Sequence, residues 1–400
     1  MGSKVLNCKN DFPIFKNQSI AYLDTASTSQ KPQNVINAVS HFYQNYNANV
    51  HRGLYPWAEK ATSDYESARH KIADYISAQN DELIFTKGTT ESINFIASAW
   101  GRKNITKNNS IVITEMEHHS NIVPWQIMGK KFNLKIRYLP INQIGELDLN
   151  ESEDFFTKKT KIVSIAHVSN VLGTINPIKK LAAMAHNVGA IFIADGAQGA
   201  PHTKVDVQEF DCDFYVFSGH KMLGPTGVGI LWGKTKLLEG MDPFMGGGEM
   251  IEDVSFEEST WNNIPYKFEA GTPNIAQAIG LGAAIDYLNN VGIENIQSHE
   301  KELTKYALKQ VSQIKNIKIH GTSNNKSGVI SFNIKNIHPQ DLTQFLDQDN
   351  IAIRVGQHCA QPLLSILNET STARISFYIY NSHEDIDKFC DSINKTLTYF

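Results

Sequence analysis

A lysine stands in a tight loop of Gly, Ser and Pro directly after an apolar run. Residues 217–225 read FSGHKMLGP, and the run before them is DFYVF. Lysine is a surface residue by default, so Lys221 at the end of a strand expected to be buried needs a reason. Three reasons fit: a paired structural charge, a cation that holds a phosphate, or an amine that does covalent chemistry. The residues at the other strand ends decide among them.

Polar groups also follow two other apolar runs earlier in the chain. After ELIFT come Gly88, Thr89 and Thr90, which open a helical pattern. Free backbone N–H groups at such a start suit a phosphate, and an ordinary N-cap is the alternative. After SIVIT come His118 and His119. Adjacent residues of an extended chain point to opposite faces, and no third ligand follows at helical spacing, so we expect one functional histidine and no metal.

A carboxylate and two amides complete this set. Asp195 ends the apolar run AIFIAD, Gln198 follows it, and Asn170 follows KIVSIAHV. A carboxylate at a buried strand end must be paired to offset its desolvation, unless it caps the next segment. Ligands of α/β sheets bind at the carboxyl ends of strands, so these groups meet in space. A phosphate site, a carboxylate, an imidazole and a lysine are what pyridoxal 5′-phosphate requires of a protein.

A second cluster lies near the C-terminus. The segment IAIRVGQHCAQP places Cys359 in a loop before Pro362, and STARISFYIY has Arg374 at the start of a strand. Free cysteines are more often inert core residues, but the neighbours of Cys359 are polar, which favours a loop thiol. An ordinary thiol of pKa about 8.5 is only a few per cent ionised near neutrality. A nearby group must therefore supply charge or take the proton.

The elements that position these residues fall into two groups. From about residue 57 to 235, apolar strands alternate with helical patterns, which indicates a mostly parallel sheet covered on both faces. Beyond a long helical pattern at 271–292, short strands and two helices indicate a smaller α+β unit, with Ser382 as the N-cap of the last helix. We predict a large α/β domain of residues 22–288 and a small domain of residues 1–21 and 289–400.

Composition narrows the class of function. The chain has 400 residues with a formal charge of −4, which disfavours nucleic acid as the main ligand. Its four cysteines are widely spaced, which indicates neither a disulfide framework nor a zinc site and favours a reducing compartment. No apolar run reaches the roughly 20 residues that a membrane helix needs. We expect a cytoplasmic protein without a membrane partner, or one of an organellar stroma if a transit peptide has been removed.

The ordered series of motifs resembles one enzyme family. TKGTTESIN, TEMEHHSN, HVSNVLGTINP, DGAQ, SGHKMLGPTG, FEAGTPN and RVGQHCAQP follow one another along nearly the whole chain. Together they resemble the SUF-type (group II) cysteine desulfurases and selenocysteine lyases, which are fold-type I pyridoxal phosphate enzymes of the class V aminotransferase family. The resemblance implies a seven-stranded sheet between helices, a homodimer, and removal of sulfur from L-cysteine to give L-alanine and a persulfide on Cys359 for iron–sulfur cluster assembly.

The resemblance also implies a role for each site residue. Lys221 would bind the cofactor's aldehyde and move the substrate's α-proton, Cys359 would accept sulfur, and His118 would stack on the ring and handle the thiol proton. Other cofactor contacts would come from Asp195 at the ring nitrogen, Gln198 at the ring hydroxyl, and the phosphate ligands Thr89, Thr90, Ser218, His220 and, from the other subunit, Thr272. The substrate contacts would be Asn170, Arg374 and, near the entrance, Arg354, His51 and Arg52.

Three positions depart from the family pattern. Gln357 replaces a second histidine, Met245 stands where histidine is common, and Ser27 interrupts a usual alanine pair. These departures bear on the subfamily more than on the reaction. The short cysteine loop implies a thiol of low mobility and a SufE- or SufU-like acceptor protein.

Other functions fit the same inventory. A selenocysteine lyase would not need Cys359, because a selenol is already ionised near neutral pH. An aminotransferase would need a second amino acceptor. A catalytically silent sulfur-relay scaffold is the non-enzymatic alternative, and the complete set of lysine, aspartate and cysteine argues against it.

Overall fold

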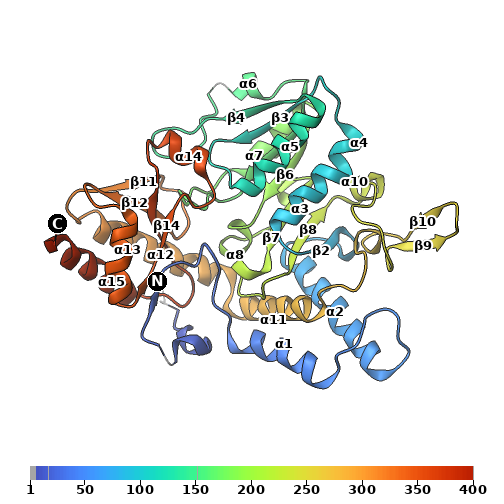
Figure 1. Cartoon of the computed structure of the whole chain (residues 1–400), viewed down its shortest axis with the longest axis horizontal. Coiled ribbons are helices and arrows are strands. Elements are labelled where there is room, and N and C mark those ends of the chain that lie inside the picture. Colours follow the sequence, from blue (N-terminus) through green and yellow to red (C-terminus); the bar gives the residue numbers. More distant parts are fainter. Residues whose placement is uncertain (1–5, 17, 151, 400) are drawn as a thin grey trace.

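A seven-stranded sheet forms the centre of the computed structural model, which describes residues 6–16, 18–150 and 152–399. Its strand order is β2-β8-β7-β6-β5-β3-β4 (Figure 1). The strands are β2 (Leu83–Thr86), β3 (Ser110–Thr114), β4 (Lys135–Leu139), β5 (Thr160–Ala166), β6 (Ile191–Asp195), β7 (Phe214–Ser218) and β8 (Gly229–Gly233). Strands β3 to β7 pair in parallel, whereas β8 is antiparallel to β2 and β7. The predicted fold class, a mostly parallel sheet with a smaller second unit, is confirmed.

Helices cover both faces of this sheet, which explains why its strands are apolar throughout. Successive side chains of β6 alternate between the faces: Phe192 joins the hydrophobic cluster that contains α7 and α11, and Ile193 joins the cluster that contains α3 and α5. The helices of this part are α1 (Gln33–Asn45), α2 (Pro56–Tyr75), α3 (Thr89–Phe95), α4 (Arg102–Asn104), α5 (Val123–Phe132), α6 (Ser152–Phe155), α7 (Ile178–Asn187), α8 (Gly199–His202), α9 (Val207–Phe210), α10 (Thr235–Gly240) and α11 (Ile275–Val291).

The antiparallel strand β8 brings the ends of β2 and β7 together. Gly229 at the start of β8 is paired on one side with Thr86 and on the other with Ser218, the last residues of those two strands. A Cβ atom on Gly229 would lie 2.3 Å from the Cα of Gly88, so only glycine fits there. Gly88 itself has a φ of 151°, a value that glycine adopts readily. The loop after β2 is therefore held against the loop after β7.

A four-stranded antiparallel sheet forms the smaller unit at one end of the molecule (Figure 1). Its order is β11-β12-β15-β14, and apolar side chains of β12 and β15 pack against α12, α13 and α15. The elements are β11 (Ile317–His320), β12 (Val329–Ile334), β13 (Ile351–Ala352), β14 (Arg354–Gly356), β15 (Thr372–Ser376), α12 (Ile293–Val311), α13 (Pro339–Gln348), α14 (Gln361–Ile366) and α15 (His383–Thr396). Ser382 is the N-cap of α15, as predicted from the sequence, and it forms a capping box with Asp385.

The N-terminal segment joins this smaller unit. Strand β1 (Ala21–Tyr22) pairs in parallel with β13, more than three hundred residues later. Phe12 lies in the hydrophobic cluster of the large sheet beside Tyr380, so the two units share part of their core. We propose the division predicted from sequence, residues 22–288 against 1–21 and 289–400; residues 1–5 and 17 lie outside the described part.

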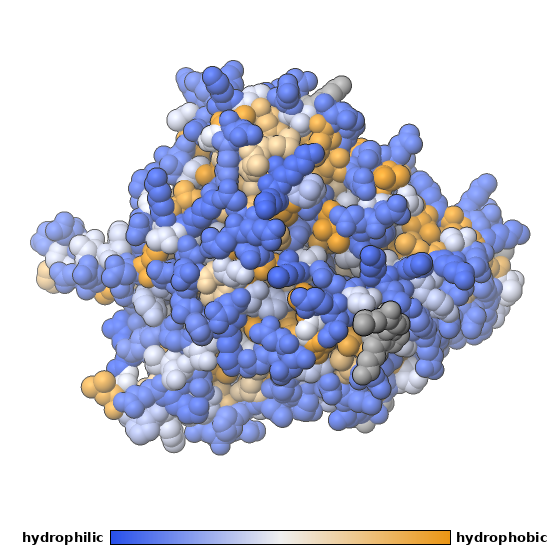
Figure 2. Space-filling model, turned by 180° about the vertical axis from the view of Figure 1, so that it is seen from behind, coloured by the Kyte–Doolittle hydropathy of each residue, from blue (hydrophilic) through white to orange (hydrophobic). Residues whose placement is uncertain are grey.

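A two-stranded hairpin, β9 (Ile251–Val254) and β10 (Ser259–Trp261), projects from the large unit (Figure 1). Its tip carries a fully exposed Phe256. Figure 2 shows the opposite face of the molecule as mostly hydrophilic, with scattered hydrophobic patches. Within the described residues, no helix has both the length and the apolar character needed to cross a membrane.

The contact between Gly229 and Gly88 leads to a prediction about stability. Gly229→Ala places a methyl group against backbone atoms of Gly88 and Phe217, which cannot rotate away as a side chain can. We expect the free energy of unfolding, measured by urea denaturation, to fall by about 1–3 kcal/mol, as for other overpacked sites. Gly240→Ala is the matched control, because a Cβ there meets nothing within 4 Å. Equal stability of the two variants would contradict the packing argument.

Candidate active site

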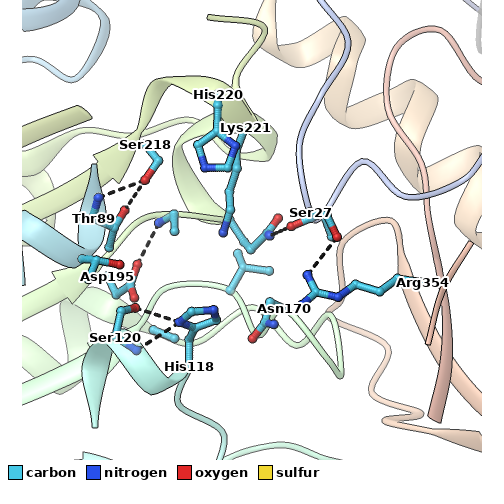
Figure 3. A pocket seen from close by; sticks show the side chains of 16 residues that line it. Ser27, Thr89, His118, Ser120, Asn170, Asp195, Ser218, His220, Lys221 and Arg354 are labelled. Carbon is cyan, nitrogen blue, oxygen red and sulfur yellow. Dashed lines mark hydrogen bonds between the residues drawn. The ribbon is translucent and has the colours of Figure 1, made fainter. Parts of the chain in front are cut away.

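A cavity of about 180 Å³ opens at the carboxyl ends of the central strands. Figure 3 shows side chains from several of these ends pointing into it. Ten residues predicted from the sequence line it: Thr89, Thr90, His118, Asn170, Asp195, Gln198, Ser218, His220, Lys221 and Arg354. They come from loops after β2, β3, β5, β6 and β7 and from strand β14 of the smaller unit. The topology therefore brings distant motifs together, as expected for strand ends of an α/β sheet.

Lys221 extends into the middle of this cavity, and its partial exposure faces the cavity (Figure 3). Within the described residues its Nζ makes no hydrogen bond or ion pair. Burial lowers the pKa of Lys221 to about 8, although the negative charge of Asp195 opposes this shift. The amine is thus far easier to deprotonate than an exposed lysine, which is what a nucleophilic amine requires.

Asp195 ends β6 and lies on the wall of the same cavity. Its Oδ1 accepts a hydrogen bond of 2.9 Å from the backbone N–H of Ala197. Burial raises the pKa of this carboxyl, and that hydrogen bond and the charge of Lys221 act against the increase. The second carboxylate oxygen has no hydrogen bond within the described residues, so it is free to accept one from a bound molecule.

His118 forms part of the cavity wall close to Asp195 (Figure 3). Its Nδ1 accepts a hydrogen bond of 3.1 Å from the N–H of Ser120, so the neutral ring carries its proton on Nε2. Burial, helped by the charge of Lys221, lowers the pKa of His118 to about 3. The ring is therefore uncharged near neutral pH and offers a flat face and an N–H donor.

The buried carboxyl of Glu117 holds the segment that carries His118 in place. Glu117 accepts hydrogen bonds from the Thr114 hydroxyl at 2.6 Å, the Asn121 amide at 2.7 Å and the Ala166 backbone N–H. Burial raises the pKa of Glu117 to about 7, and these three donors act against the increase. Glu117 thereby ties the end of β3 to the end of β5.

Hydroxyl and imidazole groups gather at another part of the wall. The Oγ of Ser218 accepts a hydrogen bond of 2.9 Å from the N–H of Thr89, and the two hydroxyls are also 2.9 Å apart. Thr90 and His220 line the cavity nearby. Burial lowers the pKa of His220 to about 4, with the charge of Lys221 next in importance. A helix start with several small donors suits a phosphate group.

Gln198 contributes an unsatisfied group. Its Nε2 donates to the carbonyl of Ala26 at 2.7 Å, while its buried Oε1 has no partner in the part of the chain that the structure describes. A buried acceptor without a hydrogen bond costs about 1–3 kcal/mol. This amide therefore provides a contact that a bound molecule would complete.

Two arginines meet at the boundary between the units. The Oγ of Ser27 accepts hydrogen bonds of 2.9 Å from both Arg354 and Arg374, and it donates to Asp24 at 2.6 Å. Arg374 is fully buried, and it also donates to Asp24 and to the carbonyl of Asn170. Arg354 lines the cavity, whereas Arg374 lies behind Ser27 and Asn170. The arrangement concentrates positive charge on one side of the cavity.

Cys359 lies beside this arginine pair. Its Sγ is 3.6 Å from the Nη2 of Arg354, within the range of a hydrogen bond to sulfur. The residue is half-buried and belongs to the turn between β14 and α14. This contact fixes the sulfur next to an arginine that lines the cavity.

Three predicted site residues lie away from the cavity within one chain. His51 pairs with Glu66 at 2.9 Å, and Arg52 pairs with Glu249 at 2.7 Å. Thr272 lines a separate cavity of about 120 Å³ next to Phe85. Their predicted roles at the entrance and at the other subunit's phosphate stay predictions.

Comparisons with known proteins agree with this geometry. Residues 21–389 match the aminotransferase class-V family. The chain belongs to that family. A "probable cysteine desulfurase" of Halalkalibacterium halodurans is 50% identical and 98% of each chain is covered. The solved cysteine desulfurase of Thermococcus onnurineus superposes with a TM-score of 0.96 at 37% identity over all of both chains, and an Escherichia coli cysteine desulfurase with 0.92 at 37% identity over 98% of each.

The polar groups in this cavity suit the cofactor of the class V family. Pyridoxal phosphate needs an amine for its aldehyde, a carboxylate for its ring nitrogen and small donors for its phosphate. The free Nζ of Lys221, the unpaired oxygen of Asp195, the unsatisfied Oε1 of Gln198 and the hydroxyls beside Ser218 supply these contacts. The residues present therefore fit this cofactor.

The sequence reasoning missed several residues of this class V site. Ser27 was noted only as a departure from an alanine pair, yet it lines the cavity and binds both arginines. Ser120 and Glu117 lie within the motif TEMEHHSN, which drew attention to its histidines alone. Apolar residues of the wall, such as Val168, carry no chemical signal in the sequence.

The lowered pKa of Lys221 predicts an unusual pattern of chemical labelling. Because the unprotonated fraction of an amine grows as the pH rises, cofactor-free protein exposed to brief pulses of acetic anhydride should label half-maximally at Lys221 near its pKa of about 8. Exposed lysines, whose ordinary pKa is about 10.4, should label half-maximally about two pH units higher. Peptide mass mapping gives both profiles in one sample.

The Asp195→Asn variant tests the charge that opposes this shift in the pKa of Lys221. Loss of the carboxylate removes the charge that raises the pKa of Lys221, so the labelling midpoint should move to lower pH. If Lys221 were labelled with the same pH midpoint as the surface lysines, the argument that burial lowers its pKa would be wrong.

Proposed function

We propose that this chain is a cysteine desulfurase of the SUF type. The reaction converts L-cysteine to L-alanine and leaves a persulfide on Cys359, for use in iron–sulfur cluster assembly. The observation that carries the proposal is the position of the Cys359 thiol, 3.6 Å from the Nη2 of Arg354, a residue that lines the cavity together with Lys221 and Asp195. The names of the relatives, which are cysteine desulfurases over essentially the whole chain, support it.

The cofactor of this reaction is pyridoxal 5′-phosphate. Lys221 would hold its aldehyde, Asp195 its ring nitrogen, His118 its ring face and Gln198 its ring hydroxyl. Its phosphate would lie among Thr89, Thr90, Ser218 and His220. Bound there, the cofactor supplies an electron sink for the bonds to the substrate's α-carbon. Asp195 supports this role, because a carboxylate opposite the ring nitrogen favours the protonated ring.

Lys221 and the arginines act on the amino acid itself. A neutral Lys221 amine, favoured by its lowered pKa, accepts the substrate's α-proton as a general base. Arg354 and Arg374 attract the substrate's carboxylate, and a guanidinium binds a carboxylate through two parallel hydrogen bonds. Arg374 already donates to Asp24, Ser27 and the carbonyl of Asn170, and its buried Nε has no partner among the described residues. That Nε–H is available to a substrate carboxylate that reaches Arg374.

The sulfur step balances without an external oxidant. The thiolate of Cys359 attacks the sulfur of the substrate, so an S–S bond forms while the C–S bond breaks. The electron pair of the C–S bond stays with the carbon fragment, which takes up protons and leaves as alanine. The two sulfurs are thereby oxidised and the carbon is reduced. His118, with its N–H on Nε2, would donate a hydrogen bond to the sulfur of the substrate.

We also propose a homodimer. Large apolar side chains are exposed on two segments of the large unit, at Leu54 and Trp57 and at Phe256 of the projecting hairpin. Exposed apolar groups of this size favour a protein interface. Thr272, which does not reach the cavity of its own chain, would then serve the phosphate site of the partner.

The outer sulfur of the persulfide must be transferred to another molecule. We propose a SufE- or SufU-like acceptor protein, because Cys359 lies in a short turn that gives the thiol little reach. L-selenocysteine is a second substrate of the same chemistry. Four cysteines without a disulfide support a reducing location, the cytoplasm or an organellar stroma.

Two substitutions separate the roles of the amine and the thiol. Lys221→Ala should lower alanine formation from L-cysteine by at least about 1,000-fold, because it removes both the cofactor's anchor and the general base. Cys359→Ala should bind cofactor normally, as judged from visible absorbance, but should stop sulfur transfer. Alanine and sulfide are measured after incubation with L-cysteine and a reductant, with and without an acceptor protein.

Matched controls make the result specific. Cys8→Ala removes another half-buried thiol, one that is outside the cavity, and should behave as the parent. If Cys359→Ala still forms alanine from L-cysteine at the parent rate, Cys359 has no role in the reaction. Transamination that depends on an added keto acid would indicate an aminotransferase instead. Protein without visible cofactor absorbance, even after addition of pyridoxal phosphate, would indicate a silent scaffold.

A further inference from the structure

The turn that carries Cys359 has an unfavourable backbone shape. His358 and Cys359 are consecutive residues with φ values of 51° and 56°, in the left-handed region. A non-glycine residue in this region costs about 1–2 kcal/mol. Two such residues in succession persist only where contacts from other parts of the chain hold them.

Two residues, Asn170 and Thr372, hold His358 in this turn. Its carbonyl accepts a hydrogen bond of 2.8 Å from the Nδ2 of Asn170. Its ring Nε2 lies 2.9 Å from the hydroxyl of Thr372 and 3.1 Å from the carbonyl of the same residue. The first half of the turn is thus fixed to β15 and to the loop after β5.

His119, the residue after His118, holds the second half of the turn. The backbone N–H of His119 donates to the carbonyl of Cys359 at 2.7 Å. Its ring Nε2 accepts a hydrogen bond of 3.0 Å from the N–H of Gln361, the first residue of α14. The first N–H groups of a helix have no partner within it, so this ring satisfies a donor that the turn leaves free.

The chemistry of the ring suits this acceptor role. Burial lowers the pKa of His119, which keeps the ring neutral. Because Nε2 accepts a hydrogen bond, the ring proton lies on Nδ1. His119 therefore holds the chain at two points on the C-terminal side of the thiol, the carbonyl of Cys359 and the N–H of Gln361. The preceding residue, His118, lines the cavity.

We propose that His119 is a positioning residue that locks the Cys359 turn to the segment carrying His118. Sulfur transfer then uses a thiol at a fixed place beside the cavity rather than one on a mobile loop. The proposal deepens the proposed function and rests on it for the part that concerns turnover. The part that concerns the mobility of the turn stands without it.

Substitutions by two amides test the ring contact. In His119→Gln the side-chain oxygen occupies the ε position, where it replaces Nε2 as an acceptor for Gln361. In His119→Asn the oxygen is one bond shorter and does not reach. Both variants keep the backbone contact to Cys359 and are polar and uncharged. His41→Asn, on the exposed side of α1, is the control for a distant histidine.

The first measurement is the rate of alkylation of Cys359 by iodoacetamide, followed by peptide mass mapping, with Cys8 of the same molecule as the reference. We expect His119→Asn to raise the Cys359 rate about three- to tenfold, the range expected for the loss of one hydrogen bond. His119→Gln and His41→Asn should keep the parent rate. This measurement is made on cofactor-free protein, so it does not depend on activity.

The second measurement is alanine formation from L-cysteine by the holoenzyme. His119→Asn should lower kcat by a similar factor and leave KM unchanged, because the substrate contacts are intact, and His119→Gln should restore kcat. A role limited to capping α14 would lower the midpoint of thermal denaturation without changing the alkylation rate or kcat, and would overturn the proposal. So would a His119→Gln variant that behaves like His119→Asn. If Cys359→Ala keeps parent activity, the proposed function fails, and the alkylation rates still decide whether His119 locks the turn.

Discussion

The buried amine of Lys221 opposite the carboxylate of Asp195 is the interaction on which the site depends. Each group is disfavoured in its charged form by burial, and each partly offsets that cost for the other. Neither is neutralised by a direct hydrogen bond between them within the described residues. The pair therefore keeps reactive groups available in a small cavity, which a fully satisfied ion pair would not do.

The fold keeps this pair in place through its strand ends. Asp195 ends β6, and Lys221 follows β7, its parallel neighbour in the sheet. The antiparallel strand β8 then brings the loop after β2 against the loop after β7, through the contact between Gly229 and Gly88. Donors suited to a phosphate thus lie at a set distance from the amine. The groups that we propose as cofactor contacts all belong to the large unit.

The smaller unit adds the groups to which we assign substrate binding and sulfur transfer. Arg354, Arg374 and Cys359 all belong to it, and they contact the large unit through Ser27, Asn170 and His119. These contacts join parts of the chain separated by some two hundred to more than three hundred residues. The position of the thiol relative to the amine is therefore set by the boundary between the units, and not by either unit alone.

Much of this could be predicted from the sequence, because the signals were local. Apolar strands alternating with helical patterns indicated the covered parallel sheet, and Ser382 indicated the N-cap of the last helix. The apolar runs before Lys221, His118 and the Thr89 loop were each followed by polar residues, and Asp195 ended a fourth run. The rule that strand ends converge was enough to place these residues together.

Only the tertiary structure decided the rest, because it rests on contacts that leave no local pattern. The left-handed turn at His358 and Cys359 is an unfavourable backbone choice that distant donors stabilise. Ser27 appeared as a minor departure until its hydroxyl was seen to bind two arginines more than three hundred residues away. The sequence by itself determined which chemical groups are present and at which strand ends. Their distances and protonation depend on burial and packing, which only the folded chain sets.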